Sequence, residues 1–194
     1  MEITTENIKA LRDETGISVM QCKKALEEAE GDMEKARVIL KKKRKEAADK
    51  KSDREIGAGV VGTYTHNTNE VAAMVLLGCE TDFVAKNDEF VQLAKDIAMH
   101  AAASDAKYIT RDEVDAAALE AAKAVFKEEV ADKPAEMQEQ IMEGKLSAYF
   151  KDQILMEQPF IKNPDQTIAD LISGAVQKFG ENVTLVAAHR LSVK

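Results

Sequence analysis

Two strand-like segments early in the chain limit its fold more than any other feature. The segments AGVVGTYTH (58–66) and EVAAMVLLGC (70–79) have a strand-like apolar pattern, and they are joined by Asn67-Thr68-Asn69, whose side chains favour turns. This arrangement predicts a β-hairpin. A third strand-like segment, NVTLVAAHRLSV (182–193), lies near the C-terminus. We therefore expect an α+β fold with a three-stranded antiparallel sheet and helices packed on one of its faces.

The first fifty residues predict a compact bundle of three short helices, because apolar residues recur on one face of each. The expected N-terminal capping residues are Thr4 or Thr5, Ser18 and Asp32, and the expected stops are Gly16 and Gly31. The third helix runs into KKKRKEAADKKSDREIG (41–57), where the apolar period disappears. We expect a three-helix module at 1–50, a charged linker at 51–57 and an α+β core domain at 58–194.

The core segment contains the patterns of four helices. The first begins near Asn87, Pro134 separates the second from the third, and the fourth begins after Asp165 or Thr167 and ends at Gly180. The expected ranges are about 87–101, 111–132, 135–156 and 167–179.

Composition narrows the class of protein. The 194 residues, 45% of them hydrophobic, allow one ordinary domain with a small companion and a packed core. A net charge of −8 argues against a broad nucleic-acid surface. The longest strongly apolar run, 71–79, is too short to span a membrane, and the N-terminus lacks the pattern of a signal peptide. We expect a cytoplasmic protein with no direct nucleic-acid or membrane contact, in which Cys22 and Cys79 are reduced thiols.

No motif in the sequence indicates an enzyme. GAGVVG (57–62) matches the GxGxxG fingerprint of dinucleotide sites, but it follows a lysine-rich segment and leads into a strand, whereas the fingerprint needs a strand before it and a helix after it. His66, His100 and His189 are too far apart to form a metal or acid–base motif. We therefore expect no catalytic residue, no cofactor and no metal.

The basic run from Lys35 to Lys51 holds nine lysines and arginines against Glu46 and Asp49. Such a run can follow phosphates, but nucleic-acid readers generally add aromatic platforms or a known module, and this run contains neither. A solvated helix end is the favoured interpretation.

The turn LLGCETDFVAKNDEF (76–90) places Asp82 and Phe83, an acid and a large ring, between a strand and a helix. In a local interpretation, Asp82 caps the following turn and Phe83 fills the strand–helix corner. In the other, the pair is an anchor: Phe83 fills a pocket on a partner while Asp82 disturbs charges or hydrogen bonds beside it. Residue chemistry leaves both interpretations open.

Several segments resemble one family. TGISVMQCKKALEEAEGDMEKA (15–36) resembles the N-terminal helical module of bacterial translation elongation factor Ts, and TDFVAKN (81–87) resembles the core signature of that family. Further segments resemble its core and C-terminal stretches: GTYTH (62–66), IAMHAAAS (97–104), MEGKLSAYFKD (142–152) and EQPFIKNPDQTIADLI (157–172). The likeness is spread over nearly the whole chain.

The resemblance implies a guanine-nucleotide exchange factor for elongation factor Tu, the GTPase that carries aminoacyl-tRNA to the ribosome. The N-terminal module would have a ubiquitin-associated-like fold and dock on the GTPase. Asp82 and Phe83 would intrude near the nucleotide and magnesium site, and His66 matches a histidine in the second core half of longer members. The implied contact residues of the module and of the signature are Val19, Met20, Cys22 and Lys23, and Thr81, Val84, Ala85, Lys86 and Asn87.

The chain has one hairpin where longer members have two similar core halves, so it resembles a short-form member in which a symmetric homodimer supplies the missing half. It is then open which GTPase molecule each His66 and Phe83 contacts. The alternative function is a non-catalytic, ubiquitin-associated-like interaction module on an α+β scaffold.

Overall fold

A computed structural model describes residues 3–130 and 134–193, which divide into two compact units. Unit 1 comprises residues 1–60, 77–91 and 170–184, and unit 2 comprises 61–76, 92–169 and 185–194. The outer ends of the expected domains, at 1–2 and 194, and the expected helix end at 131–132 lie outside the described residues. Residues up to 60 thus group with two segments of the expected core, 77–91 and 170–184. That the module at 1–50 and the core at 58–194 fold as separate domains stays a prediction.

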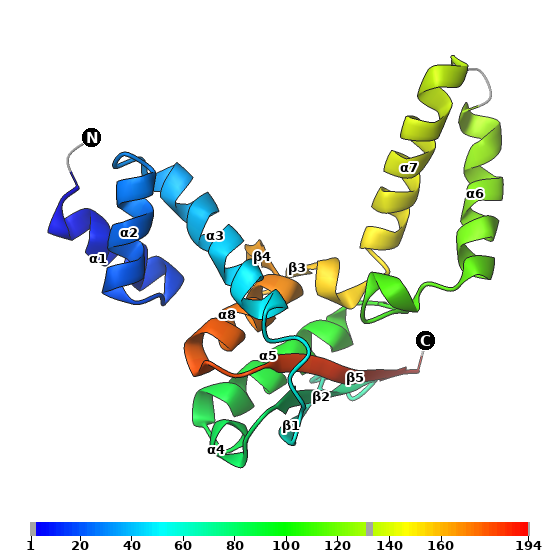
Figure 1. The fold of residues 1–194 in the computed structure, drawn as a ribbon. Coiled ribbons are helices and arrows are strands. Elements are labelled where there is room, and N and C mark those ends of the chain that lie inside the picture. Colours follow the sequence, from blue (N-terminus) through cyan, green and yellow to red (C-terminus); the bar gives the residue numbers. More distant parts are fainter. Residues whose placement is uncertain (1–2, 131–133, 194) are drawn as a thin grey trace. The chain divides into compact units, whose positions relative to one another are not determined.

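Unit 1 begins with three helices, α1 (Thr5–Thr15), α2 (Val19–Glu28) and α3 (Met33–Asp49), which surround a common apolar core (Figure 1). The expected caps form: Thr4, Ser18 and Asp32 each accept a backbone N–H of the following helix through a side-chain oxygen. Gly16 ends α1 in the left-handed conformation, with φ 68°. The buried core consists of Leu11, Ile17, Cys22, Ala25, Leu26, Ala29, Ala36 and Leu40.

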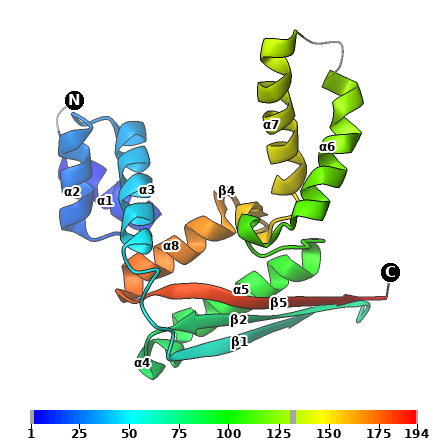
Figure 2. The ribbon, with the colours of Figure 1, turned by 45° about the vertical axis from the view of Figure 1, so that its right-hand side comes forward.

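The sheet contains β1 (Ala58–Thr65), β2 (Val71–Cys79) and β5 (Val183–Ser192) in the order β1-β2-β5 (Figure 2). The His66 N–H donates to the Val71 carbonyl at 2.8 Å to close the hairpin, and Asn69 takes a left-handed backbone with φ 60°. The Val193 N–H donates to the Glu70 carbonyl, so the end of β5 lies beside the start of β2. All neighbouring strands therefore run antiparallel, and the expected α+β fold is confirmed.

One face of the sheet is covered by α5 (Asp88–Ala103), whose close approach depends on Gly62 in β1. A Cβ at Gly62 would lie 2.3 Å from the carbonyl carbon of Ala94, so only glycine fits there. Among residues 3–130 and 134–193, no helix covers the opposite face (Figure 2). Alternation along the strands places Val61, Met74 and Val186 on this uncovered face, and all three are exposed.

The remaining elements are α4 (Asp82–Ala85), η1 (Arg111–Glu113), α6 (Ala116–Val130), α7 (Ala135–Lys151), η2 (Leu155–Glu157), β3 (Pro159–Phe160), β4 (Asn163–Thr167) and α8 (Ile168–Phe179). The helix expected from 111 begins at Ala116, because the Asp115 carboxylate accepts the Ala118 N–H at 2.6 Å and caps it there. The helix expected to 156 ends at Lys151, because the backbone of Ile154 pairs with that of Tyr108.

The pair β3 and β4 forms a small antiparallel sheet where the sequence indicates only chain breaks. Each strand of a two-stranded sheet is an edge strand, so Pro159 and Pro164, which cannot donate a backbone hydrogen bond, are tolerated in it. The one-turn helix α4 is likewise not evident from the sequence, which indicates a turn.

Replacing Gly62 by alanine should destabilise the protein by roughly 1–3 kcal/mol, because the methyl group forces α5 away from β1. Gly144→Ala is the matched control: nothing lies within 4 Å of a Cβ at that helical position, and the change should stabilise by about 0.5–1 kcal/mol. Thermal and urea unfolding of both variants measure the difference. Equal stabilities would contradict the close contact at Gly62.

Candidate functional site

The corner between β2 and α5 presents Phe83 to solvent. Phe83 is 85% exposed, whereas the next residue, Val84, is buried. Val84 therefore fills the strand–helix corner, and the local interpretation of Phe83 as the corner plug is wrong. A large ring left this exposed forgoes about 1.5–3 kcal/mol that burial would provide, so it is an unusual choice for a surface turn.

Asp82 is the first residue of α4 and does not cap it. The cap position belongs to Thr81, which makes no side-chain capping bond. The Asp82 carboxylate accepts a hydrogen bond from Lys86 Nζ at 2.6 Å, and this bond and the lysine charge lower the pKa of Asp82. Both side chains are largely exposed, so the pair contributes little to stability and a partner's charged groups can replace either member.

The signature segment ends by starting α5. The Asn87 side chain accepts the Glu89 N–H at 2.9 Å, and the Asn87 carbonyl accepts the Val91 N–H, as expected for a helix-capping residue. Ala85 is half-buried, and Lys86 and Asn87 are exposed. Thr81, Asp82, Phe83, Lys86 and Asn87 thus form one exposed surface around the corner, supported from inside by Val84.

A second exposed patch lies on the first turn of α2. Val19 and Met20 are exposed, Met20 by 69%, and Lys23 pairs loosely with Glu27 at 3.8 Å. Cys22 is fully buried in the bundle core, where its thiol lies 3.7 Å from the Ile17 carbonyl. The surface of this turn therefore consists of Val19, Met20 and Lys23, and Cys22 packs beneath it.

His66 is exposed at the end of β1, where its Nδ1 lies 3.3 Å from the hydroxyl oxygen of Tyr64. It belongs to unit 2, whereas the α2 patch and the β2–α5 corner belong to unit 1. The structure thus places the exposed residues of the expected contact set at three sites, the β2–α5 corner, the first turn of α2 and His66, whereas Cys22 and Val84 are buried.

Most of the basic run on α3 is engaged within unit 1. Lys41 binds Asp170 of α8 at 2.8 Å, and Arg37 binds Glu14 of α1 at 2.7 Å. Arg44 donates to the Thr15 carbonyl and to Gln177 of α8, and burial lowers the pKa of its guanidinium. The bonds to Asp170 and Gln177 join the bundle to α8, and those to Glu14 and Thr15 hold α3 against α1, so the run has a structural role.

The other titratable candidates are also structural. His100 is buried; its Nε2 lies 2.9 Å from Oε1 of Gln158 and its Nδ1 accepts the Ile161 N–H, and burial lowers its pKa. The buried Cys79 thiol donates to the Thr81 carbonyl, and burial followed by the charge of Glu181 raises its pKa. Among residues 3–130 and 134–193, no group of three or more His, Cys, Asp or Glu is placed to hold a metal ion. In the same ranges, no helix is long and apolar enough to cross a membrane.

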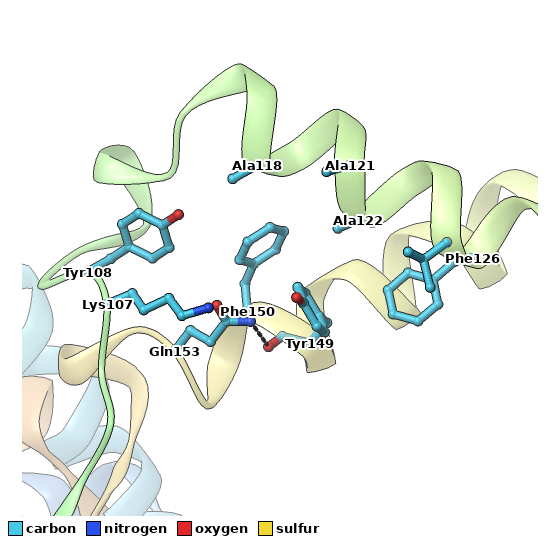
Figure 3. Close-up of a pocket in the computed structure, with 10 residues that line it drawn as sticks. Lys107, Tyr108, Ala118, Ala121, Ala122, Phe126, Tyr149, Phe150 and Gln153 are labelled. Atoms are coloured by element: carbon cyan, nitrogen blue, oxygen red, sulfur yellow. Dashed lines mark hydrogen bonds between the residues drawn. The ribbon is translucent and has the colours of Figure 1, made fainter. Parts of the chain in front are cut away.

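A pocket of about 240 Å³ lies between α6 and α7 in unit 2 (Figure 3). Phe150 points from α7 toward the alanines of α6, and Phe126 and Tyr149 extend the aromatic wall with their rings edge to face at 5.7 Å. Lys107 is the charged residue of the lining, which holds no nucleophile paired with a base. The pocket therefore offers apolar contact rather than bond chemistry.

The comparisons with known proteins agree with one another. A model of the family described as Elongation factor TS matches residues 47–193. Proteins named elongation factor Ts are 46% identical over 184 residues in Thermodesulfovibrio yellowstonii, covering 94% of this chain and 92% of the relative, and 45% identical over 185 residues in Carboxydothermus hydrogenoformans, covering 94% and 85%. The protein of that name in Fervidobacterium nodosum is 42% identical over 195 residues, covering 100% of this chain and 99% of the relative.

Proposed function

The chain belongs to the elongation factor Ts family, and from this membership we propose how its exposed patches act. Its function is that of a guanine-nucleotide exchange factor that binds elongation factor Tu and promotes GDP release during translation elongation. Such a factor forms no covalent bond. It binds the nucleotide-free GTPase better than the loaded one, and linkage requires that it weaken GDP binding by the same factor by which GDP weakens its own.

We propose that Asp82 and Phe83 enter the GTPase near its nucleotide and magnesium site. The observation that carries this proposal is the exposure of Phe83 beside the buried Val84. A ring held out from a strand–helix corner can enter a pocket, and Asp82, whose carboxylate accepts a hydrogen bond from the exposed Lys86, can exchange that partner for groups near the magnesium. Displaced phosphate and magnesium contacts weaken GDP, and each 1.4 kcal/mol of coupling changes affinity about tenfold.

The α2 patch would supply docking affinity. Val19 and Met20 offer apolar contact at the start of α2, and Lys23 supplies a charge at their edge. Interface energy usually concentrates in a few well-packed side chains, so an exposed methionine flanked by valine and lysine suits an anchor. Docking through the bundle would bring the core near the nucleotide. The bundle itself would not take part in GDP release.

We also propose that two copies form a homodimer through the uncovered face of the sheet. Val61, Met74 and Val186 form an apolar strip on three neighbouring strands, and such a strip is expected where another surface covers it. His66, at the end of the same hairpin, would contact the GTPase in a two-plus-two assembly. The protein would act in the cytoplasm, where translation takes place.

The alternative function, a ubiquitin-associated-like interaction module on an unrelated scaffold, is not favoured, because the family model matches residues 47–193, which include residues 58–193 of the expected core. Such a module would bind peptides or ubiquitin-like surfaces and leave GDP release unchanged, so the following exchange measurement separates the two functions.

Phe83→Ala should fold normally and slow stimulated GDP release by about tenfold or more, because the ring that enters the GTPase is lost. Stopped-flow release of a fluorescent GDP analogue from elongation factor Tu measures the rate. Val125→Ala, which truncates another side chain exposed by 65%, is the control and should release GDP like the unaltered chain. Full activity of Phe83→Ala would contradict the proposed entry of Asp82 and Phe83, the wedge, into the GTPase.

Met20→Glu should weaken binding of nucleotide-free elongation factor Tu by about tenfold, because a carboxylate would replace an apolar contact. Calorimetric titration measures the affinity, and the maximal exchange rate at saturating factor should stay near that of the unaltered chain. Val38→Glu serves as the control, since Val38 lies in the same bundle and is equally exposed, at 69%. Equal affinities of the two variants would contradict docking through α2.

Val61→Lys combined with Met74→Lys should convert a homodimer into a monomer, because four like charges would face one another across the symmetric interface. Sedimentation equilibrium of the free chain and of its complex with elongation factor Tu gives both stoichiometries. Val125→Lys adds a charge on α6 and should leave the dimer intact. A monomeric unaltered chain would refute the dimer.

A further inference from the structure

We propose that Glu181 is a positioning residue that fixes the direction in which Asp82 and Phe83 are presented, an inference that rests on the proposed function of that pair. Glu181 lies in the turn between α8 and β5, about a hundred residues along the chain from the corner. No sequence motif marks it, and its carboxylate binds Glu80 and Thr81, the two residues before Asp82. Its effect would pass through the backbone that precedes α4.

The Glu181 carboxylate binds three donors at this backbone. Oε2 accepts the N–H of Glu80 at 3.1 Å and the N–H of Thr81 at 3.0 Å, and Oε1 accepts the Thr81 hydroxyl at 2.5 Å. Hydrogen bonds to an ionised acceptor are roughly twice as strong as neutral ones. The last two residues before Asp82 are therefore held by one side chain.

Glu80 in turn binds the backbone of the segment that carries Glu181. Oε1 of Glu80 accepts the Asn182 N–H at 2.5 Å and lies 3.4 Å from Nη1 of Arg54. The buried Asn182 side chain in turn donates to the carbonyls of Ser52 and Arg54. Each glutamate thus binds the backbone beside the other, and the end of β2, the start of β5 and the segment after α3 are joined at one point.

The geometry of α4 shows why an external hold matters. A single helical turn is unstable by itself, since nucleation fixes several residues for very few hydrogen bonds. A threonine at the cap position ordinarily accepts a helix N–H, but the Thr81 hydroxyl donates to Glu181 and makes no capping bond. The hydroxyl that would stabilise α4 from within ties it to the turn after α8 instead.

The turn that carries Glu181 is itself fixed. Gly180 ends α8 with φ 75°, a conformation that glycine adopts without strain, and its N–H donates to the Val176 carbonyl. α8 is bound to the helix bundle through Lys41 with Asp170 and to α5 through Lys178 with Glu89. Because α8 is held in place, Glu181 at its end holds the backbone of Glu80 and Thr81 in a fixed position relative to α8.

Rigid presentation has a functional consequence. Ordering a loop on binding costs free energy that a preorganised loop does not lose, and displacements of about 1 Å can change rates by about a hundredfold. Without the three bonds from Glu181, Phe83 would sample several directions, and fewer encounters would displace the magnesium and phosphate contacts.

The test is a double-mutant cycle of Glu181→Ala and Phe83→Ala in the full chain with elongation factor Tu. Glu181→Ala should lower the maximal rate of stimulated GDP release by about tenfold, and it should add no loss when Phe83 is already alanine. Glu143→Ala, which removes an exposed glutamate of α7, should leave the rate unchanged. Hydrogen exchange at the amides of Glu80 and Thr81 should quicken in Glu181→Ala, with circular dichroism reporting intact folding.

The outcomes separate the two proposals. A Phe83→Ala variant with full activity overturns the proposal that Asp82 and Phe83 enter the GTPase. If Phe83→Ala is slow, a Glu181→Ala variant with full activity, or losses that multiply in the double variant, overturns the positioning role alone. Should Glu181→Ala not fold, Glu181→Gln retains the shape and one acceptor oxygen and should lower the rate by about threefold with the same non-additivity. Unchanged release by Glu181→Gln would then overturn the role.

Discussion

The enclosure of β2 is the constraint on which the candidate site depends. β2 is the middle strand of the sheet, and alternate side chains along it, Ala73, Val75 and Leu77, are buried. The hydrogen-bond ladders on both edges and the burial of one face leave this strand little freedom to shift, because a one-residue slip would expose its buried side chains. The exposed corner follows directly from its end, so Asp82 and Phe83 project from the most enclosed strand of the sheet.

The elements that could be predicted from the sequence are those encoded by neighbouring residues. Thr4, Ser18 and Asp32 cap helices within three residues of themselves, and the hairpin turn depends on Asn69. The small β3–β4 sheet, by contrast, depends on pairing that prolines mask. The local signals at 81–83 were ambiguous, because whether Val84 or Phe83 fills the corner depends on the direction of α4.

The tie from Glu181 to the corner could not be predicted, since nothing near either segment in the sequence points to the other. The same distinction applies to the basic run. Its sequence favours a solvated helix end over a track for phosphates, yet its partners include Glu14 in α1 and Asp170 in α8. Charge composition therefore overstated the free positive surface, because a one-dimensional reading cannot show which acids the fold brings to each lysine and arginine. The residues of the docking patch and of the wedge were identified by family resemblance, and burial then separated Cys22 from its exposed neighbours.

The environment of Cys79 has a consequence for the behaviour of the protein under oxidative stress. Its thiol is buried, donates to the Thr81 carbonyl, and has a raised pKa because burial and the charge of Glu181 disfavour the thiolate. The thiolate is the form that reacts with oxidants and with disulfides, and a raised pKa makes this form scarce at neutral pH. Cys79, three residues before Asp82, is thus a poor target for oxidants, although it lies next to the exposed corner.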